Sequence, residues 1–381
     1  MTASFTRQWH IVRHDKWLLA CLTWLPVMLS LSIWAIFSAG IARNLPVGVV
    51  DLNHSRLSQQ LVRNVNASPT MNVTQMPNDV SSAKQALIEG DIYAYLVIPV
   101  DFEKDTVKGL SPQVSAFYNS QYVLVGKLIN SALTQAHATF NAQIETLSGL
   151  SQGSQTLSGA MAHAVPIQTQ ITPLFNLNSN YAQFLVTAIV PALWQIMVVV
   201  VTIMILAANH QHQSLERWLG PKPLRHVVTT LAPYFPIYAL HGALFLAWFY
   251  GVEHWPFHGQ FALVILAQWF TAIACMIMGA FFYFLTLDTA RAMSFAGAFT
   301  APSFAFMGIT FPVTDMGPLA QFWRSLLPVS HYIQVQVAQS SYGADLISTL
   351  HTLIPMLGYS LPLLLISLLI TWQRTKQEKA R

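Results

Sequence analysis

The chain has 381 residues, of which 54% are hydrophobic and only 9% are charged. Soluble domains carry about 25% charged residues, so this composition excludes an ordinary soluble protein and indicates an integral membrane protein. The formal net charge of +4 favours anionic lipid headgroups over nucleic acid as partners. Cys21 and Cys275 both fall inside apolar runs, which excludes a disulfide framework or a zinc ribbon.

Charged or polar segments separate six apolar runs, and each run is long enough to cross a hydrocarbon core of about 30 Å as a helix. The predicted spans are Trp17–Gly40, Phe184–Ala208, Val227–Gly251, Gln260–Leu287, Met293–Phe311 and His351–Trp372. We interpret the first as an uncleaved anchor, because it is too long and too aromatic for a signal peptide. An even number of spans places both termini on one side.

Basic residues near the span ends set the orientation, because they are retained on the cytoplasmic side. With both termini inside, the cytoplasmic segments hold eleven basic and four acidic residues, and the outer segments hold eight basic and eleven acidic residues. We therefore predict cytoplasmic termini. The pieces are then a cytoplasmic interfacial helix at 1–16, the first span at 17–40 and a basic cytoplasmic tail at 373–381.

Residues 41–183 have the composition of a soluble domain and are predicted to lie outside the cytoplasm. Strands are expected at Leu45–Leu52, 72–75, Ile92–Ile98 and Val114–Tyr118, with helices beginning at Ser55 and Asp79 and a long helical stretch over 121–150. Strands that alternate with helices predict an α/β domain. The segment 148–164 is rich in Ser, Gly, Gln and Thr, which predicts a flexible turn.

Residues 184–372 are predicted to form a five-helix transmembrane domain, interrupted by a cytoplasmic loop at 209–226. This loop carries Glu216 and Arg217 beside Trp218 and Leu219, between two uncharged runs. A partner outside the membrane could act there on the helices inside it.

The sequence contains no motif that indicates ATP hydrolysis, metal binding or ion coupling by this chain itself. Neither Gly126-Lys127 nor Gly220-Pro221-Lys222 belongs to a phosphate-binding glycine loop. His254 and His258, spaced to share a helix face, are interpreted as interface residues rather than metal ligands. The spans lack the charged relays of ion-coupled carriers. No cofactor is expected. The energy for any transport must then come from a partner protein.

The chain resembles the permease subunits of type-2 ABC transporters in several segments and in its layout of one span before the domain and five after it. The segments are IVRHDKWLLACLTWLPVM, ARNLPVGVVDLNHSRLSQQLVRNVNASP, ALIEGDIYAYLVIPVDFEKDTVKG and the pair Tyr118-Asn119. The resemblance covers essentially the whole chain, within the group that has a large periplasmic domain between its first two spans. It implies a pair of permeases, or a permease and a homologue, each docked on a cytoplasmic ABC ATPase subunit.

The resemblance also implies contact residues for that ATPase. In the family the loop between the second and third spans carries an acidic residue and a Gly-Thr pair, whereas the matching segment here, HQSLERWLGPKP, lacks the Gly-Thr pair. The expected ATPase-coupling residues are Glu216, Arg217, Trp218, Leu219, Arg7, Trp9 and Arg13.

We therefore expect a non-enzymatic permease of the bacterial inner membrane that exports an amphipathic drug-like or lipid-like cargo, with a periplasmic adaptor as a further candidate partner. The candidate cargo path consists of Trp194, Met197, Phe304, Met307 and Phe311. The alternative interpretation is that these aromatic and methionine side chains pack against lipid or other helices. The alternative function is a membrane-anchored receptor or envelope-organising protein that transports nothing.

Overall fold

The computed structural model describes residues 2–151, 156–157, 161, 174–176 and 179–380. Contacts divide the chain into two compact units, one made of Met1–Gly40 with Pro173–Arg381 and the other of Ile41–Thr172. Each unit has a hydrophobic core of its own. Most of the predicted flexible turn at 148–164 lies outside the described residues.

The unit Ile41–Thr172 is an α/β structure. Its elements are β1 (Leu45–Asp51), α4 (Arg56–Asn66), β2 (Met71–Gln75), α5 (Val80–Glu89), β3 (Ala94–Ile98), α6 (Phe102–Val107), β4 (Ser115–Tyr118) and α7 (Val123–Ser151). The sheet order is β2-β1-β3-β4, with β1 parallel to both neighbours and β4 antiparallel to β3. The predicted strands and helix starts are confirmed to within three residues.

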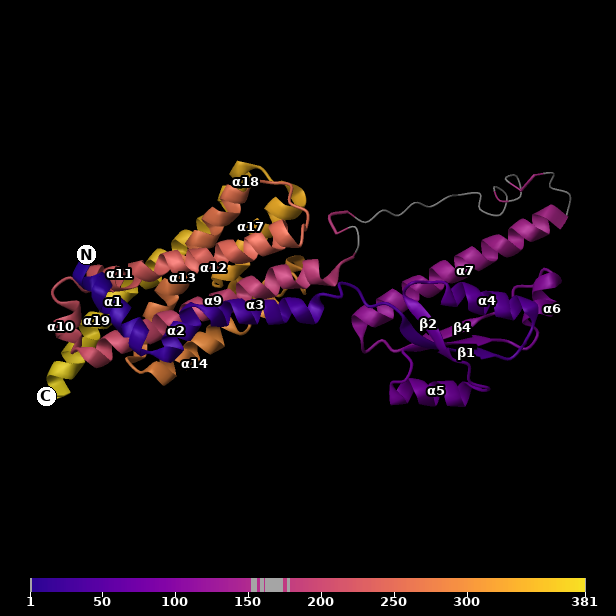
Figure 1. Ribbon diagram of the computed structural model, residues 1–381, viewed down its shortest axis with the longest axis horizontal. Coiled ribbons are helices and arrows are strands. Elements are labelled where there is room, and N and C mark those ends of the chain that lie inside the picture. The colour runs from indigo at the N-terminus through magenta and orange to yellow at the C-terminus, as the bar shows by residue number, and fades with distance from the viewer. Residues whose placement is uncertain (1, 152–155, 158–160, 162–173, 177–178, 381) are drawn as a thin grey trace. The chain divides into compact units, whose positions relative to one another are not determined.

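Helices cover both faces of this sheet, with α4 and α7 on one face and α5 on the other (Figure 1). The central strand β1 is consequently buried along nearly its whole length. A strand enclosed on both sides requires a continuous apolar run rather than an alternating one, which explains the LPVGVV pattern. Phe102 of α6 stacks on Phe140 of α7, with ring centroids 5.9 Å apart.

Asp51 organises the start of α4. Its Oδ1 accepts hydrogen bonds from the backbone N–H groups of Asn53 and His54, each at 3.0 Å, and its Oδ2 accepts one from the Ser58 hydroxyl at 2.7 Å. Ser55 is the N-cap, and Ser58 completes a capping box with it. The carboxylate is 7% exposed, so these donors are largely withheld from water.

We expect Asp51→Ala to lower the free energy of local unfolding at the start of α4 by about 2–4 kcal/mol, because it leaves buried donors without their charged acceptor. Amide hydrogen exchange of the full-length protein measures the effect, which should appear first in the opening turn of α4. Asp91→Ala, which removes an exposed carboxylate, is the control and should leave that exchange unchanged. Equal protection in the two variants would contradict the role given to Asp51.

The second unit is helical. Its elements are α1 (Thr2–His14), α2 (Lys16–Leu22), α3 (Trp24–Phe37), α9 (Tyr181–His212), α10 (Leu215–Leu219), α11 (Pro223–Leu231), η1 (Ala232–Tyr234), α12 (Phe235–Ala247), the π-helical turn η2 (Trp248–Val252), α13 (Phe261–Thr286), α14 (Thr289–Thr300), α15 (Ser303–Phe306), η3 (Val313–Asp315), α16 (Pro318–Ser325), α17 (Pro328–Tyr342), α18 (Leu346–Leu353), η4 (Ile354–Tyr359) and α19 (Ser360–Ala380).

Four helical stretches among the described residues are long and apolar enough to cross a membrane, namely Tyr181–Gln211, Pro223–Val252, Phe261–Thr286 and Leu346–Lys376. The pair α2 and α3, bent by 50°, makes a fifth when it is counted as one span. The bend follows from Pro26, which has no N–H to bond the preceding turn and whose ring crowds the carbonyl there.

The stretch predicted as the fifth transmembrane helix, Met293–Phe311, does not form one helix. Here α14 ends at Thr300 and the chain breaks before the single turn of α15. Twelve residues at 1.5 Å each give about 18 Å, too short to cross alone. Pro302 supplies the break, because proline cannot donate to the preceding turn. The single-helix expectation was wrong here.

The predicted shared helix face of His254 and His258 is also wrong, because residues 254–260 are not helical. His254 has a positive φ of 52°, which no helix accommodates. The His258 ring nitrogen Nδ1 instead lies 2.8 Å from the carbonyl oxygen of Ser340.

Candidate functional site

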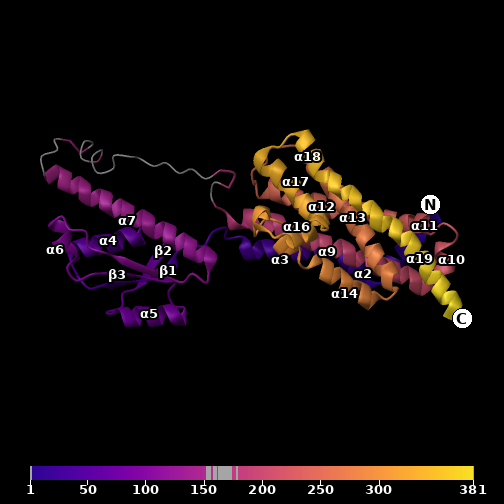
Figure 2. The ribbon, with the colours of Figure 1, turned by 180° about the vertical axis from the view of Figure 1, so that it is seen from behind.

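One end of the helical unit gathers both chain termini with the 209–226 segment. In both views α1, α10, α11 and the end of α19 lie together at this end (Figures 1 and 2). We call it the terminal surface and define it by α1, residues 209–226 and the last two turns of α19.

A buried amide pair fastens α1 to the end of α9. The Gln8 Nε2 donates to Asn209 Oδ1 and the Asn209 Nδ2 donates to Gln8 Oε1, both at 3.0 Å. Tyr234 of η1 donates its hydroxyl to the same Gln8 oxygen at 3.0 Å, and Asn209 also donates to the Ile205 carbonyl. Because Gln8 is 4% and Asn209 0% exposed, these bonds compete little with water and fix three elements to one another.

Arg7 extends the same contact. Its guanidinium donates to Gln213 Oε1 at 3.0 Å and to the Asn209 carbonyl at 3.4 Å. Burial lowers the pKa of Arg7 from its ordinary value, but a guanidinium remains charged at any physiological pH. Arg7 therefore acts inside the unit, while Trp9 and Arg13 on the same helix are exposed.

The short helix α10 has one buried and one exposed face. Leu215, Trp218 and Leu219 are buried, whereas Glu216 and Arg217 are exposed. The Trp218 ring stacks on Phe284 of α13 with centroids 6.2 Å apart, and its indole N–H donates to Thr230 of α11 at 3.4 Å. The buried face of α10 therefore contacts both α11 and α13.

Two further contacts hold the 209–226 segment. His210 Nδ1 lies 2.8 Å from the Tyr283 hydroxyl of α13, and the Arg374 guanidinium of α19 donates to the Gly220 carbonyl at 2.8 Å. Gly220 has φ 51° and ψ −155°, a conformation open essentially to glycine alone, and it turns the chain from α10 toward α11. The segment is thus fixed to several helices of the unit.

The structure therefore separates the seven predicted coupling residues into two groups. Trp9, Arg13, Glu216 and Arg217 are exposed on the terminal surface, whereas Trp218 and Leu219 are buried and Arg7 is half-buried. The sequence analysis missed Gln8, Asn209 and Tyr234. The available signal was the amide Asn209 at the end of a long apolar run, a position where polar side chains join membrane helices.

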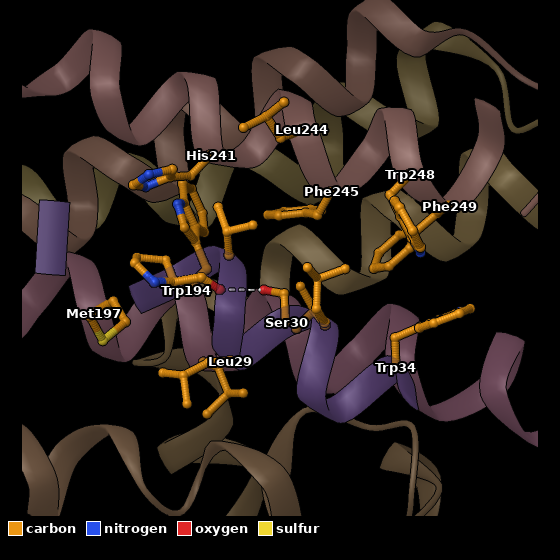
Figure 3. Close-up of a pocket in the computed structure, with 15 residues that line it drawn as sticks. Leu29, Ser30, Trp34, Trp194, Met197, His241, Leu244, Phe245, Trp248 and Phe249 are labelled. Carbon is orange, nitrogen blue, oxygen red and sulfur yellow. Dashed lines mark hydrogen bonds between the residues drawn. The ribbon is translucent and has the colours of Figure 1, made fainter. Parts of the chain in front are cut away.

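An apolar cavity of about 200 Å³ lies between α3, α9 and α12 (Figure 3). Trp194 and Met197, two of the five predicted cargo-path residues, line it together with His241, Phe245 and Trp248. The other three are placed elsewhere: Phe304 is half-buried, Met307 is buried in the core and Phe311 is exposed.

Polar groups at this cavity are few and uncharged. The Ser30 hydroxyl donates to the Pro26 carbonyl at 2.8 Å within α3, and the His241 side chain interacts with the backbone of Thr23 beside the α2–α3 bend. The indole N–H groups of Trp194 and Trp248 are buried and have no hydrogen-bond partner among the described residues. The accessible lining of the cavity is therefore almost entirely apolar.

A second buried amide, Gln195, joins the middle of α9 to the break after α14. Its Nε2 donates to the Ser303 hydroxyl at 2.9 Å, and its Oε1 accepts from the Val329 backbone N–H at 2.9 Å. All these partners are buried. The interrupted stretch around Pro302 is thus held by specific hydrogen bonds, as non-helical backbone in an apolar environment requires.

Comparison with known proteins gives one family match. The model of the ABC-2 family transporter proteins matches residues 16–369, which is most of the chain and includes both units. No curated protein matches the chain.

Proposed function

Because this chain belongs to the ABC-2 family of transporter proteins, we propose that it exports an amphipathic, drug-like or lipid-like cargo across the bacterial inner membrane, driven by ATP hydrolysis on a separate subunit. The chain is a multi-pass membrane component of an ABC transporter and not itself an enzyme. What we propose beyond this is the outward direction of transport, its dependence on ATP and the class of cargo.

The proposed orientation places the terminal surface in the cytoplasm and residues 41–183 on the outer side. Support comes from the excess of basic residues in the N-terminal segment, the 209–226 loop and the tail, since such residues are retained inside. The terminal surface then faces the compartment that contains ATP.

The observation that carries the proposal is the two-sided character of α10. Glu216 and Arg217 are exposed while Trp218 and Leu219 of the same helix are buried. We propose that an ATPase subunit binds Glu216 and Arg217 together with Trp9 and Arg13 of α1.

Transmission into the bundle follows from the buried contacts. The stacking of Trp218 on Phe284 links α10 to α13, and the Gln8–Asn209 pair links α1 to α9. Helices α9 and α13 also pack against each other. A displacement at the exposed residues would therefore move the core helices together, because packed interiors transmit strain rather than absorb it.

The proposed cargo path begins at the cavity between α3, α9 and α12, where Trp194 and Met197 lie. A mainly apolar cavity suits the apolar body of an amphipathic molecule. In this proposal a second permease completes the membrane pathway, and a periplasmic adaptor binds the unit 41–172.

Co-purification and ATP hydrolysis test this proposal. The purified permease alone should hydrolyse no ATP, and affinity purification from the native membrane should recover an ABC ATPase. Exchanging the two charges, with Glu216→Arg and Arg217→Glu in one protein, should lower cargo export at least about tenfold, the equivalent of 1.4 kcal/mol of lost coupling. The protein should remain inserted in the membrane.

The matched control exchanges charges of the outer unit, with Asp101→Lys and Lys104→Asp, an exposed pair joined by the 3.3 Å ion pair of the α6 start. Export should be unaffected there. If the variant with Glu216→Arg and Arg217→Glu exported cargo normally, the 209–226 loop would have no role in coupling. Reproducible absence of an ATPase would favour a non-transporting receptor.

A further inference from the structure

A layer of three aromatic rings closes the inner wall of the cavity. The ring centroids of Trp194 and Phe245 are 5.9 Å apart, those of Trp194 and Tyr332 are 6.5 Å apart, and those of Phe245 and Tyr332 are 6.4 Å apart. Trp194 and Phe245 line the cavity, whereas Tyr332 of α17 does not. Tyr332 therefore packs against two rings that line the cavity without lining it itself.

Behind this layer lies an amide without partners. Gln268 of α13 is 0% exposed, and neither its Nε2 nor its Oε1 has a hydrogen-bond partner among the described residues. The buried Tyr332 hydroxyl interacts with this amide, although neither group completes a hydrogen bond of full geometry.

Gly242 of α12 makes the position of this amide available. A Cβ at residue 242 would stand 2.1 Å from Cδ of Gln268, so no other residue type fits without displacing the side chain. Gly242 also lies in sequence between His241 and Phe245, which both line the cavity. The amide is consequently held against the same helix that forms the cavity wall.

An unpartnered buried amide is costly, because it has given up its hydrogen bonds to water and received none in return. Gln195 shows the usual solution in the same unit, with its nitrogen and its oxygen both bonded. Among the described residues the Tyr332 hydroxyl is the neighbour that can pair with the Gln268 amide, and it can satisfy only one of the two polar groups, which leaves the other for a ligand.

The surroundings define the chemistry of that ligand. Helices α9, α12, α13 and α17, which supply Trp194, Phe245, Gln268 and Tyr332, contain no Asp, Glu, Lys or Arg. A charged headgroup would find no counter-charge there and would bear the full cost of desolvation. An amide group can both donate to and accept from an uncharged headgroup.

We propose that Gln268, with Tyr332 and Trp194, is the headgroup site for an uncharged amphipathic ligand whose apolar tail occupies the cavity between α3, α9 and α12. The headgroup reaches the amide when the Trp194 and Phe245 rings move apart. This inference rests on the proposed function, since it names the cargo class of the same cavity, but binding itself requires no ATPase.

Photo-crosslinking of the permease alone in lipid nanodiscs tests the site. The probes are dodecanamide, dodecanoate and dodecyltrimethylammonium, each carrying a diazirine at the end of its chain. The amide probe should label peptides of α9 and α12 about tenfold more than either charged probe, a difference worth roughly one hydrogen bond. Equal labelling by the three probes would overturn the headgroup assignment.

Two substitutions locate the recognition at the amide. Gln268→Leu should reduce labelling by the amide probe about tenfold and leave labelling by the charged probes unchanged. Gly242→Ala should do the same by displacing the amide, and it keeps the test valid if the first variant does not fold. Unchanged labelling in both variants would show that water satisfies Gln268 and would overturn the proposal.

Thermal unfolding without ligand distinguishes a binding amide from a structural one. Gln268→Leu should raise the apparent Tm by about 2–4 °C, because it removes an unpartnered polar group. Gln195→Leu is the matched control and should lower it, because it leaves Ser303 and Val329 without partners. A lowered Tm for both would make Gln268 structural and overturn the proposal. Selective amide labelling without ATP-dependent export would refute the proposed function alone.

Discussion

Replacing Gln8 by leucine is expected to release α1 from the helical unit and to uncouple ATP hydrolysis from export. Gln8 accepts hydrogen bonds from Asn209 and Tyr234 and donates one to Asn209. Leucine leaves these buried groups unpartnered, at a cost of about 2–4 kcal/mol. Since α1 carries two of the exposed residues of the terminal surface, its displacement should lower export at least about tenfold.

A double-mutant cycle measures the amide pair itself. Asn209→Leu alone should be as damaging as Gln8→Leu, whereas the double variant should be less destabilised than the sum of the two, because no amide is then left without its partner. A coupling free energy of about 0.5–3 kcal/mol is expected for residues in one hydrogen-bond network. Additive losses in thermal stability would show that the two amides act independently.

The exposed residue Gln211 provides the control for export. It lies two residues beyond Asn209 in α9 but its side chain is exposed, so Gln211→Leu should preserve both stability and export. If Gln8→Leu also preserved export, α1 would be an anchor with no part in coupling.

Gly279→Ala is expected to separate α13 from α9. A Cβ at residue 279 would stand 2.7 Å from the Val199 carbonyl oxygen and 2.9 Å from Cβ of Thr202, both on α9. The first of these is backbone and cannot rotate away. Close approach of two helices through a small residue is a common basis of membrane packing, and overpacking it should cost about 1–3 kcal/mol.

Apparent Tm in nanodiscs and the monodisperse yield measure this loss. Gly297→Ala is the matched control, because residue 297 is a helical glycine of α14 with no atom within 4 Å of a Cβ placed there. That substitution should leave stability unchanged or slightly raised, since alanine favours helix over glycine. Equal stability of the two variants would contradict the close α9–α13 contact.

Local features of the fold were predictable from the sequence. The capping residues Ser55 and Asp79 begin helices at the expected places. The long uncharged runs that became α9 and α13 were also recognised. Both kinds of signal act over one or two helical turns, through backbone hydrogen bonding and side-chain periodicity, so spacing along the chain is enough to reveal them.

The predicted coupling residues show where that reasoning stops. Polarity favours an exposed Glu216 and a buried Trp218, but it cannot say that Trp218 stacks on a ring of α13 or that Arg7 bonds within the unit. The fifth predicted span, Met293–Phe311, is not one continuous helix. Its hydrophobic composition suits a spanning helix, yet the break at Pro302 is stabilised by Gln195 from α9.

The sequence by itself determined that this is a membrane protein with an α/β unit after its first apolar run, because composition and short-range periodicity carry that information. Only the tertiary structure decided that Gln8 and Asn209, 201 positions apart, form one buried pair, and that Gln268 is left without a partner. Both outcomes depend on which helices pack together. The sequence around a glutamine in an apolar run does not reveal whether packing will place a hydrogen-bond partner beside it.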